Sequence, residues 1–184
     1  RGCANVRFEV GSVYALPYGE GAFDAAFVHA LLQHLGEPVR ALTEIRRVLK
    51  PGGVIGVADA DHDGAIFSPP HPAIARSTEL LAQLRTRNGG GDARVGKRLR
   101  ALLHEAGFSR TVGSATAGYQ GTSDATKLTG AWQAHYFSAP EFVEHVVALG
   151  LADRAALAEM SDAWRACGAD PSAFSAAFWC EAVG

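Results

Sequence analysis

The segment from Ala22 to Ala58 constrains the fold most, because it alternates apolar runs with an amphipathic helix. AFDAAFVHALL contains a short apolar run that is typical of a strand buried on both faces of a parallel sheet. Apolar residues at helical spacing follow from Pro38, and the sequence KPGG ends this helix. VIGVA is then a second apolar, β-branched strand. Together with an alternating strand at Val6–Val10, this order predicts an α/β fold with a parallel sheet.

The stretch DADHDG, Asp59–Gly64, opens like a calcium-binding loop, with three aspartates on alternate residues before a glycine. The twelfth loop position is Pro70, where the motif requires a glutamate, and a strand precedes the stretch where a helix is required. Calcium is therefore excluded. Ligands of open α/β sheets bind at the carboxyl ends of strands. We therefore expect these carboxylates and His62 to line or border a pocket, with some of them only solvated.

The rest of the chain continues to alternate helices and strands. The glycine-rich break Asn88–Asp92 matches no nucleotide-binding pattern, and we interpret it as a flexible linker or lid hinge. The expected helices cover 73–87, about 95–106, 139–149 and 154–167, and the expected strands cover about 110–115 and 174–183. The basic run at 94–100 is expected to form a solvated helix face.

Composition sets the broad class of protein. A chain of 184 residues predicts one domain, and a net charge of −2 does not favour nucleic acid or an anionic membrane as a partner. No apolar run reaches the length of a membrane span, and no signal-peptide pattern is present. The three cysteines are widely spaced and odd in number, which predicts reduced thiols in a cytoplasmic protein and neither a disulfide framework nor a metal site.

Four short markers occur in order in the first third of the chain: GSVYALP after a strand, FD opening the next strand, HALLQHL, and EIRRVLKPGG. A later helix ends in LLHEAGF. With this order and spacing, the sequence resembles the class I S-adenosylmethionine-dependent methyltransferases. Within them it is most similar to the small-molecule group that includes the quinone-biosynthesis C-methyltransferases and natural-product tailoring enzymes. The likeness is strong over 6–61, moderate to Ala115 and weak over 118–171.

The resemblance implies a Rossmann-like sheet and S-adenosylmethionine as cofactor, with S-adenosylhomocysteine as product. Ser12 matches a position that is usually an aspartate and accepts a hydrogen bond from the adenine amino group, and the backbone N–H of Val13 would donate to the ring. Leu16, of the LP marker, belongs to the same cofactor-binding segment. His29 matches the position whose backbone touches the methionine part of the cofactor, and Gln33 follows it.

Two histidines are candidates for a catalytic base. The implied reaction is attack of a small-molecule nucleophile on the methyl carbon, for which the enzyme supplies alignment and, where needed, a base. His34 is the first candidate and His62 the second, because the pKa of histidine lies near neutrality. Either imidazole could instead cap a helix or a strand end. Aromatic residues of the variable segment are expected mostly in the core, with one or two in a substrate pocket: Tyr119, Trp132, Tyr136, Phe137 and Phe142.

The family's glycine-rich cofactor motif, which follows its first strand, does not occur in this sequence. The family's sheet has the order 3-2-1-4-5-7-6, and residues 1–184 match its carboxyl-terminal portion, strands 3 to 7, with a helical, substrate-facing insertion at 118–171 between the last two strands. We therefore expect a single, incomplete methyltransferase domain. An N-terminal half, in cis or in trans, would complete it, and the chain alone would be soluble only as a homo-oligomer. The alternative is a non-catalytic, methyltransferase-like binding or assembly subunit.

Overall fold

The computed structural model describes residues 5–184, and its centre is one four-stranded sheet of order β1-β2-β4-β3. The strands are β1 (Phe23–His29), β2 (Leu49–Ser68), β3 (Val112–Gln120) and β4 (Phe174–Val183). β1 pairs with β2 in parallel, whereas β4 runs antiparallel to both of its neighbours. This is the order expected for strands 4-5-7-6 of the family, and the predicted Rossmann-like α/β architecture is confirmed.

Two helices cover one face of the sheet. α1 (Pro38–Val48) begins with a proline, whose fixed φ suits the first helical turn, and α3 (Leu99–Glu105) follows the short 3₁₀ turn η2 (Gly96–Arg98). Apolar side chains of both helices pack against those of β1 and β2, which point to this face. The members at the centre of this sheet core are Val28, Leu42, Ile45, Ile55, Val57, Leu99, Leu102 and Leu103.

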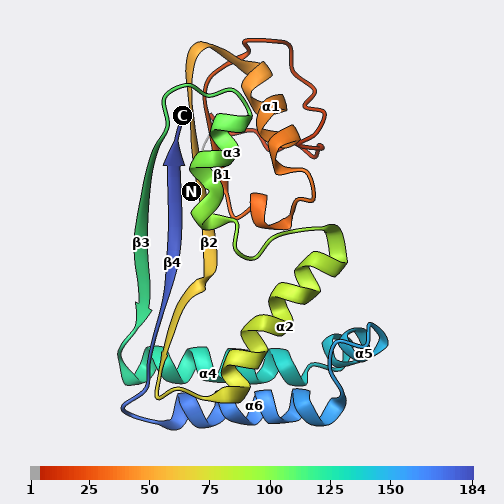
Figure 1. Cartoon of the computed structure of the whole chain (residues 1–184), viewed down its shortest axis with the longest axis vertical. Coiled ribbons are helices and arrows are strands. Elements are labelled where there is room, and N and C mark those ends of the chain that lie inside the picture. Colours follow the sequence, from red (N-terminus) through yellow and green to blue (C-terminus); the bar gives the residue numbers. More distant parts are fainter. Residues whose placement is uncertain (1–4) are drawn as a thin grey trace.

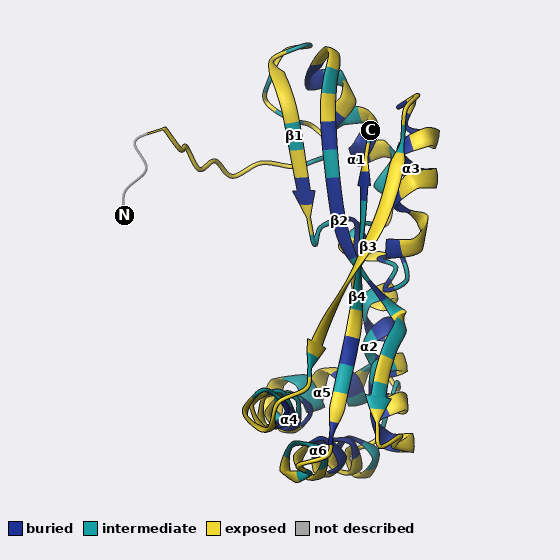
Figure 2. Ribbon diagram, turned by 90° about the vertical axis from the view of Figure 1, so that its left-hand side faces the viewer, coloured by how far each residue is buried: buried dark blue, intermediate teal, exposed yellow. Residues whose placement is uncertain are grey.

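The other face of the sheet is largely uncovered, and Figure 2 shows most of β1 and β3 as exposed. Successive side chains of a strand point to opposite faces, so Val28 is buried while its neighbour Phe27 is 73% exposed. Val54 on β2 and Val112 on β3 are exposed as well. The expectation that the first strand of the strand–helix–strand unit is buried on both faces is therefore wrong for the described residues 5–184, because none of their elements covers the second face.

The strand expected at Val6–Val10 is not a strand of this sheet. The segment is exposed and makes no strand pairing, and Figure 2 shows it running away from the body of the molecule. In the family order, strands one and two lie between the third strand and β1. Without such neighbours, the backbone groups of this segment have no ladder to join.

A second core lies at the far end of the long strands. α4 (Ser123–Ser138), α5 (Pro140–Ala148) and α6 (Arg154–Ala169) connect β3 to β4, and α2 (Pro72–Gly89) packs against them (Figure 1). The centre of this helical core is formed by large, buried side chains, among them Phe137 and Trp164. The sequence predicted α2, α5 and α6, but α4 was missed. Its weak amphipathic pattern alternates small and polar residues.

Between residues 5 and 184, no helix combines the length and the hydropathy that a membrane crossing requires. Cys167 and Cys180 are free thiols, as expected, and Cys3 lies outside the described residues.

Candidate functional site

A buried carboxylate fixes the turn that follows β1. Asp59 lies on β2 just after the last parallel pair, His29 with Ala58, and its side chain is fully buried. One of its oxygens, Oδ2, accepts a hydrogen bond of 2.9 Å from the backbone N–H of Leu32, the first residue of the 3₁₀ turn η1 (Leu32–His34). Burial raises the pKa of Asp59, and hydrogen bonds from the backbone of η1 oppose that rise. Asp59 thus positions η1, and with it His34.

The glycine-rich turn after α2 packs closely on the same segment. Gly90 adopts a left-handed conformation at the end of α2, with φ 72°, and a side chain on Gly36 would come within 3.0 Å of the carbonyl oxygen of Gly89. A methyl group on Gly91 would overlap the carbonyl oxygen of Gln33. The interpretation of Asn88–Asp92 as a flexible linker or lid hinge stays a prediction, but the turn is packed against a neighbouring segment. Its glycines allow two backbones to approach closely.

DADHDG was expected at the end of a strand, but it lies within β2. The pairing of β2 with β4 is irregular between Asp61 and Ile66. Asp61 is buried, and its Oδ2 accepts from the backbone N–H of Lys97 at 2.9 Å, which caps η2. Asp63 is exposed and forms ion pairs with Arg94 and Lys97. These aspartates make structural contacts, and Asp63 together with His62 also borders a hollow of about 240 Å³, as expected for part of this stretch. No cluster of three potential metal ligands occurs in residues 5–184.

The two candidate bases lie in one cavity of about 530 Å³, between η1, β2, α2 and α4. Its lining consists of His34, His62, Leu81, Leu84, Arg85, Asn88, Gly89, Trp132, Gln133 and Tyr136. The structure thus brings together two histidines that are 28 positions apart. Burial, and next the charge of Arg85, lower the pKa of His62, so His62 is neutral at pH 7.

One wall of this cavity is aromatic. Trp132 and Tyr136, one turn apart on α4, stack with ring centroids 5.5 Å apart and an interplanar angle of 13°. The sequence predicts one or two aromatic residues of the variable segment in the lining of a pocket, and Trp132 and Tyr136 line this cavity. The cavity size and its mixed lining are typical of sites for small molecules.

The segment that matches the adenine site lies against α1. The backbone N–H of Leu16 donates to Glu44 Oε1 at 2.9 Å, and Arg47 with this N–H lowers the pKa of Glu44 to about 2. Val13 and Leu16 pack on the edge of the sheet core, while Ser12 is exposed and its hydroxyl accepts from the backbone N–H of Tyr14. Ser12 and Val13 are thus held in a defined turn, apart from the histidine cavity.

His29 and Gln33 flank the carboxyl end of β1 but have different surroundings. The His29 ring lies on the uncovered sheet face and stacks on Trp179, with centroids 4.8 Å apart. Gln33 is buried, and its Oε1 has no hydrogen-bond partner in the described part of the chain. A buried acceptor of this kind calls for a donor, since leaving it unpaired costs free energy.

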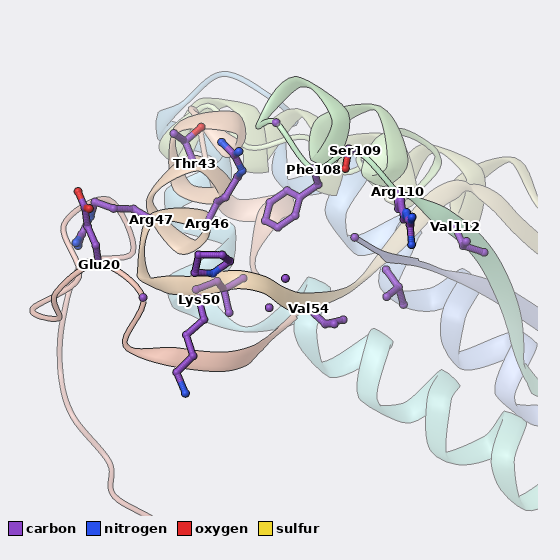
Figure 3. Close-up of a pocket in the computed structure, with 18 residues that line it drawn as sticks. Glu20, Thr43, Arg46, Arg47, Lys50, Val54, Phe108, Ser109, Arg110 and Val112 are labelled. Atoms are coloured by element: carbon purple, nitrogen blue, oxygen red, sulfur yellow. The ribbon is translucent and has the colours of Figure 1, made fainter.

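A larger hollow of about 1150 Å³ lies at the opposite end of the parallel strands (Figure 3). Figure 3 shows Arg46, Lys50, Phe108 and Arg110 around it. Ligands of open α/β sheets bind at the carboxyl ends of the strands, and this hollow lies at the amino ends of β1 and of the parallel part of β2. It is therefore not the candidate site, in spite of its size.

Comparison with known proteins supports the resemblance. Residues 1–57 match a family model described as a methyltransferase domain. An uncharacterized methyltransferase of Schizosaccharomyces pombe is 35% identical over 104 residues, which are 56% of this chain and 37% of that protein. A demethylmenaquinone methyltransferase of Renibacterium salmoninarum is 40% identical over 58 residues, 32% of this chain and 24% of that protein. The chain spans less than half the length of these curated relatives.

The crystal structure of the YcgJ protein from Bacillus subtilis shares the fold, with a TM-score of 0.52 at 16% identity over 97% of this chain and 70% of that one. At this identity the likeness concerns the fold alone. Sequence and fold together confirm the resemblance to the class I methyltransferases that the four sequence markers indicate. None of these comparisons tests the roles of individual site residues.

Proposed function

We propose that this chain forms the acceptor-binding half of an S-adenosylmethionine-dependent methyltransferase that acts on a small molecule. The observation that carries the proposal is the cavity at His34 and His62. It opens directly after the carboxyl end of β1, the sheet edge where ligands of such folds bind, and His34 in its lining belongs to the segment that matches the methyltransferase model.

Residues of this chain fit one side of the cofactor. Ser12 and Val13 would hold the adenine edge, and the backbone at His29 and the buried, unpaired Oε1 of Gln33 would face the amino-acid end. Serine lacks the charge of the aspartate usual at this position, so its contact would be weaker. The cofactor supplies an electrophilic methyl group when it is bound.

The chain's own contribution to the reaction is alignment and proton removal. The aromatic wall and the apolar side chains of α2 would orient the acceptor, and His34 would accept the proton from the attacking atom. Asp59 and the glycine turn hold the His34 backbone from two sides, which restricts the position of this base. His62, neutral through burial, is the second candidate for this role.

A complementary segment, in cis or in trans, would supply the remainder of the cofactor site. The free edge of β1 offers unpaired backbone groups, and the uncovered sheet face exposes Phe27, Val54 and Val112. A segment that pairs with β1 would satisfy this edge and bring its glycine-rich turn to the carboxyl end of the sheet. A homo-oligomer could cover the same face when the segment is lacking.

The alternative is a methyltransferase-like subunit that binds or assembles without catalysis, and Ser12 in place of an acidic residue favours it. Calorimetry with S-adenosylmethionine separates the two proposals. We expect no measurable binding by residues 1–184 alone and clear binding by the longest natural polypeptide, or by the chain mixed with its complementary half. In that complete protein, Ser12→Phe should weaken binding and Ser12→Asp should not. A complete protein that binds no cofactor would leave only the non-catalytic function.

The role of His34 is tested by turnover. His34→Ala in the complete protein should lower kcat by a factor on the order of 10² or more, with little change in cofactor affinity. The loss should shrink for an acceptor that is already ionised at the assay pH. His104→Ala, an exposed histidine on α3, is the matched control and should keep full activity. If His34→Ala also keeps full activity, the base is His62 or none is used.

A further inference from the structure

Three arginines of the described chain are half-buried, and they differ in their partners. Arg47 forms an ion pair with Glu44 at 2.7 Å, and Arg94 forms ion pairs of 2.6 Å with both Asp63 and Glu79. Arg85 forms no ion pair and no side-chain hydrogen bond with any residue from 5 to 184. A guanidinium is always charged and carries five donors, so those of Arg85 are left for water or for a bound molecule.

Arg85, the half-buried arginine without an ion pair in the described chain, lies at the candidate site. It lines the cavity of His34 and His62, opposite no carboxylate that pairs with it. Burial is the main effect on its pKa and lowers it, while the carboxylate of Asp59 acts in the other direction without forming an ion pair with it. Arg85 therefore contributes a positive charge to a cavity in which burial keeps His62 neutral.

Two further features of the cavity describe its occupant. Trp132 and Tyr136 present stacked rings, a surface that suits a flat, aromatic molecule. Gln133 also lines the cavity, and its buried Oε1 has no partner within the described chain. The aromatic wall and the unpaired guanidinium line one volume of about 530 Å³.

We infer that Arg85 selects the methyl acceptor by its charge: it binds a planar aromatic molecule that carries an acidic group, such as a carboxylate or an ionised phenol. The inference rests on the proposed methyltransferase function for the word acceptor, but the anion site itself does not. Arg85 binds the acidic group through a charge-assisted hydrogen bond or a bidentate pair, and the aromatic wall holds the ring.

The test is a binding measurement on the longest natural polypeptide that contains this chain, with 2-naphthoate as the anionic probe and 2-naphthamide as its neutral counterpart. Arg85→Gln should weaken 2-naphthoate binding roughly 10- to 100-fold, the range expected when a hydrogen bond to a charged group is lost. Binding of 2-naphthamide should change less than about twofold. Arg85→Lys keeps the charge but not the planar fork, and should lie between.

Arg87→Gln is the matched control, because Arg87 is exposed on the same helix and does not line this cavity. It should bind 2-naphthoate like the wild type, and thermal unfolding should show all variants folded. Equal affinity of Arg85→Gln and wild type for 2-naphthoate would overturn the inference. So would an equal loss for the amide, or a wild type that binds neither probe.

Cofactor binding, measured on the same samples, keeps the two proposals apart. If S-adenosylmethionine binds and 2-naphthoate binding does not depend on Arg85, the charge selection is wrong and the methyltransferase proposal stands. If 2-naphthoate depends on Arg85 and S-adenosylmethionine does not bind, the anion site stands without the methyltransferase.

Discussion

The two cores of this molecule contrast in how completely their elements are covered. In the helical core, α2, α4, α5 and α6 enclose Phe137 from all sides, and its side chain is fully buried. In the sheet core, α1 and α3 cover one face, and Phe27 on the other face is 73% exposed. One chain thus contains a region whose apolar side chains are enclosed and a region whose apolar side chains stay exposed on one face of a sheet.

The first prediction compares the stability effect of truncating a buried phenylalanine of the helical core with that of truncating an exposed phenylalanine of the sheet. Phe137→Ala should lower the free energy of unfolding by about 3–5 kcal/mol, because it leaves a cavity in a closed core. Phe27→Ala should change it by less than about 0.5 kcal/mol in residues 1–184 at concentrations where the chain is monomeric, since that ring then contacts water. Denaturant unfolding measures both.

The same pair shows whether the open face is covered in the complete protein. There, Phe27→Ala should become clearly destabilising, whereas the effect of Phe137→Ala should stay the same. If Phe27→Ala is as costly in the chain alone as Phe137→Ala, the contrast between the regions is wrong.

The second prediction concerns the contact between the regions at the glycine turn. Gly91→Ala should lower the free energy of unfolding by about 1–3 kcal/mol, because its methyl group would overlap the carbonyl oxygen of Gln33 and displace η1. Gly19→Ala, where a methyl group meets no atom within 4 Å, is the matched control and should be nearly neutral. Two variants of equal stability would show that the turn is a mobile linker after all.

The third and smallest effect is the pH dependence that Asp59 contributes. Burial raises the pKa of Asp59 in the folded state, so its ionised form opposes folding. The resulting loss of stability grows as the pH rises from the pKa of the unfolded state through the pKa of the folded state. Asp59→Asn removes the loss. Relative to wild type, the variant should show no gain in its free energy of unfolding at pH 4 and an increasing gain as the pH rises toward 7. A difference that does not vary with pH would contradict the raised pKa.

Sequence reasoning succeeded where the determining pattern is local. The unit formed by β1, α1 and the first half of β2 could be predicted, because apolar spacing, Pro38 and the two glycines after Lys50 lie within the unit itself. The strand at Val6–Val10 failed for the opposite reason: its alternation is real, but a strand needs neighbours, and those are not in the described sheet.

The candidate site was predictable only in part. His34 and His62 could be named from the position of each after an apolar strand, but their shared cavity depends on the pairing of β2 far beyond Ala58. Arg85 was missed, because on α2 it is one of several polar residues and only the packing shows that it lacks a carboxylate. Asp59 was expected in a pocket and instead holds a backbone turn, a role that no sequence spacing reveals.

The length of β2 has a mechanical consequence. At the rise of an extended chain its twenty residues would span about 65 Å. This one strand therefore reaches from the sheet core to Phe67, which packs against the helical core. Its pairing with β1 is irregular between Leu49 and Val54, and its pairing with β4 is irregular between Asp61 and Ile66. Insertion or deletion of one residue between Asp61 and His62 would turn His62 to the opposite face of the sheet. The regular pairing with β4 on either side of the irregular stretch would be kept. The length of this irregular stretch therefore determines the side from which His62 lines the cavity, independently of the other lining residues.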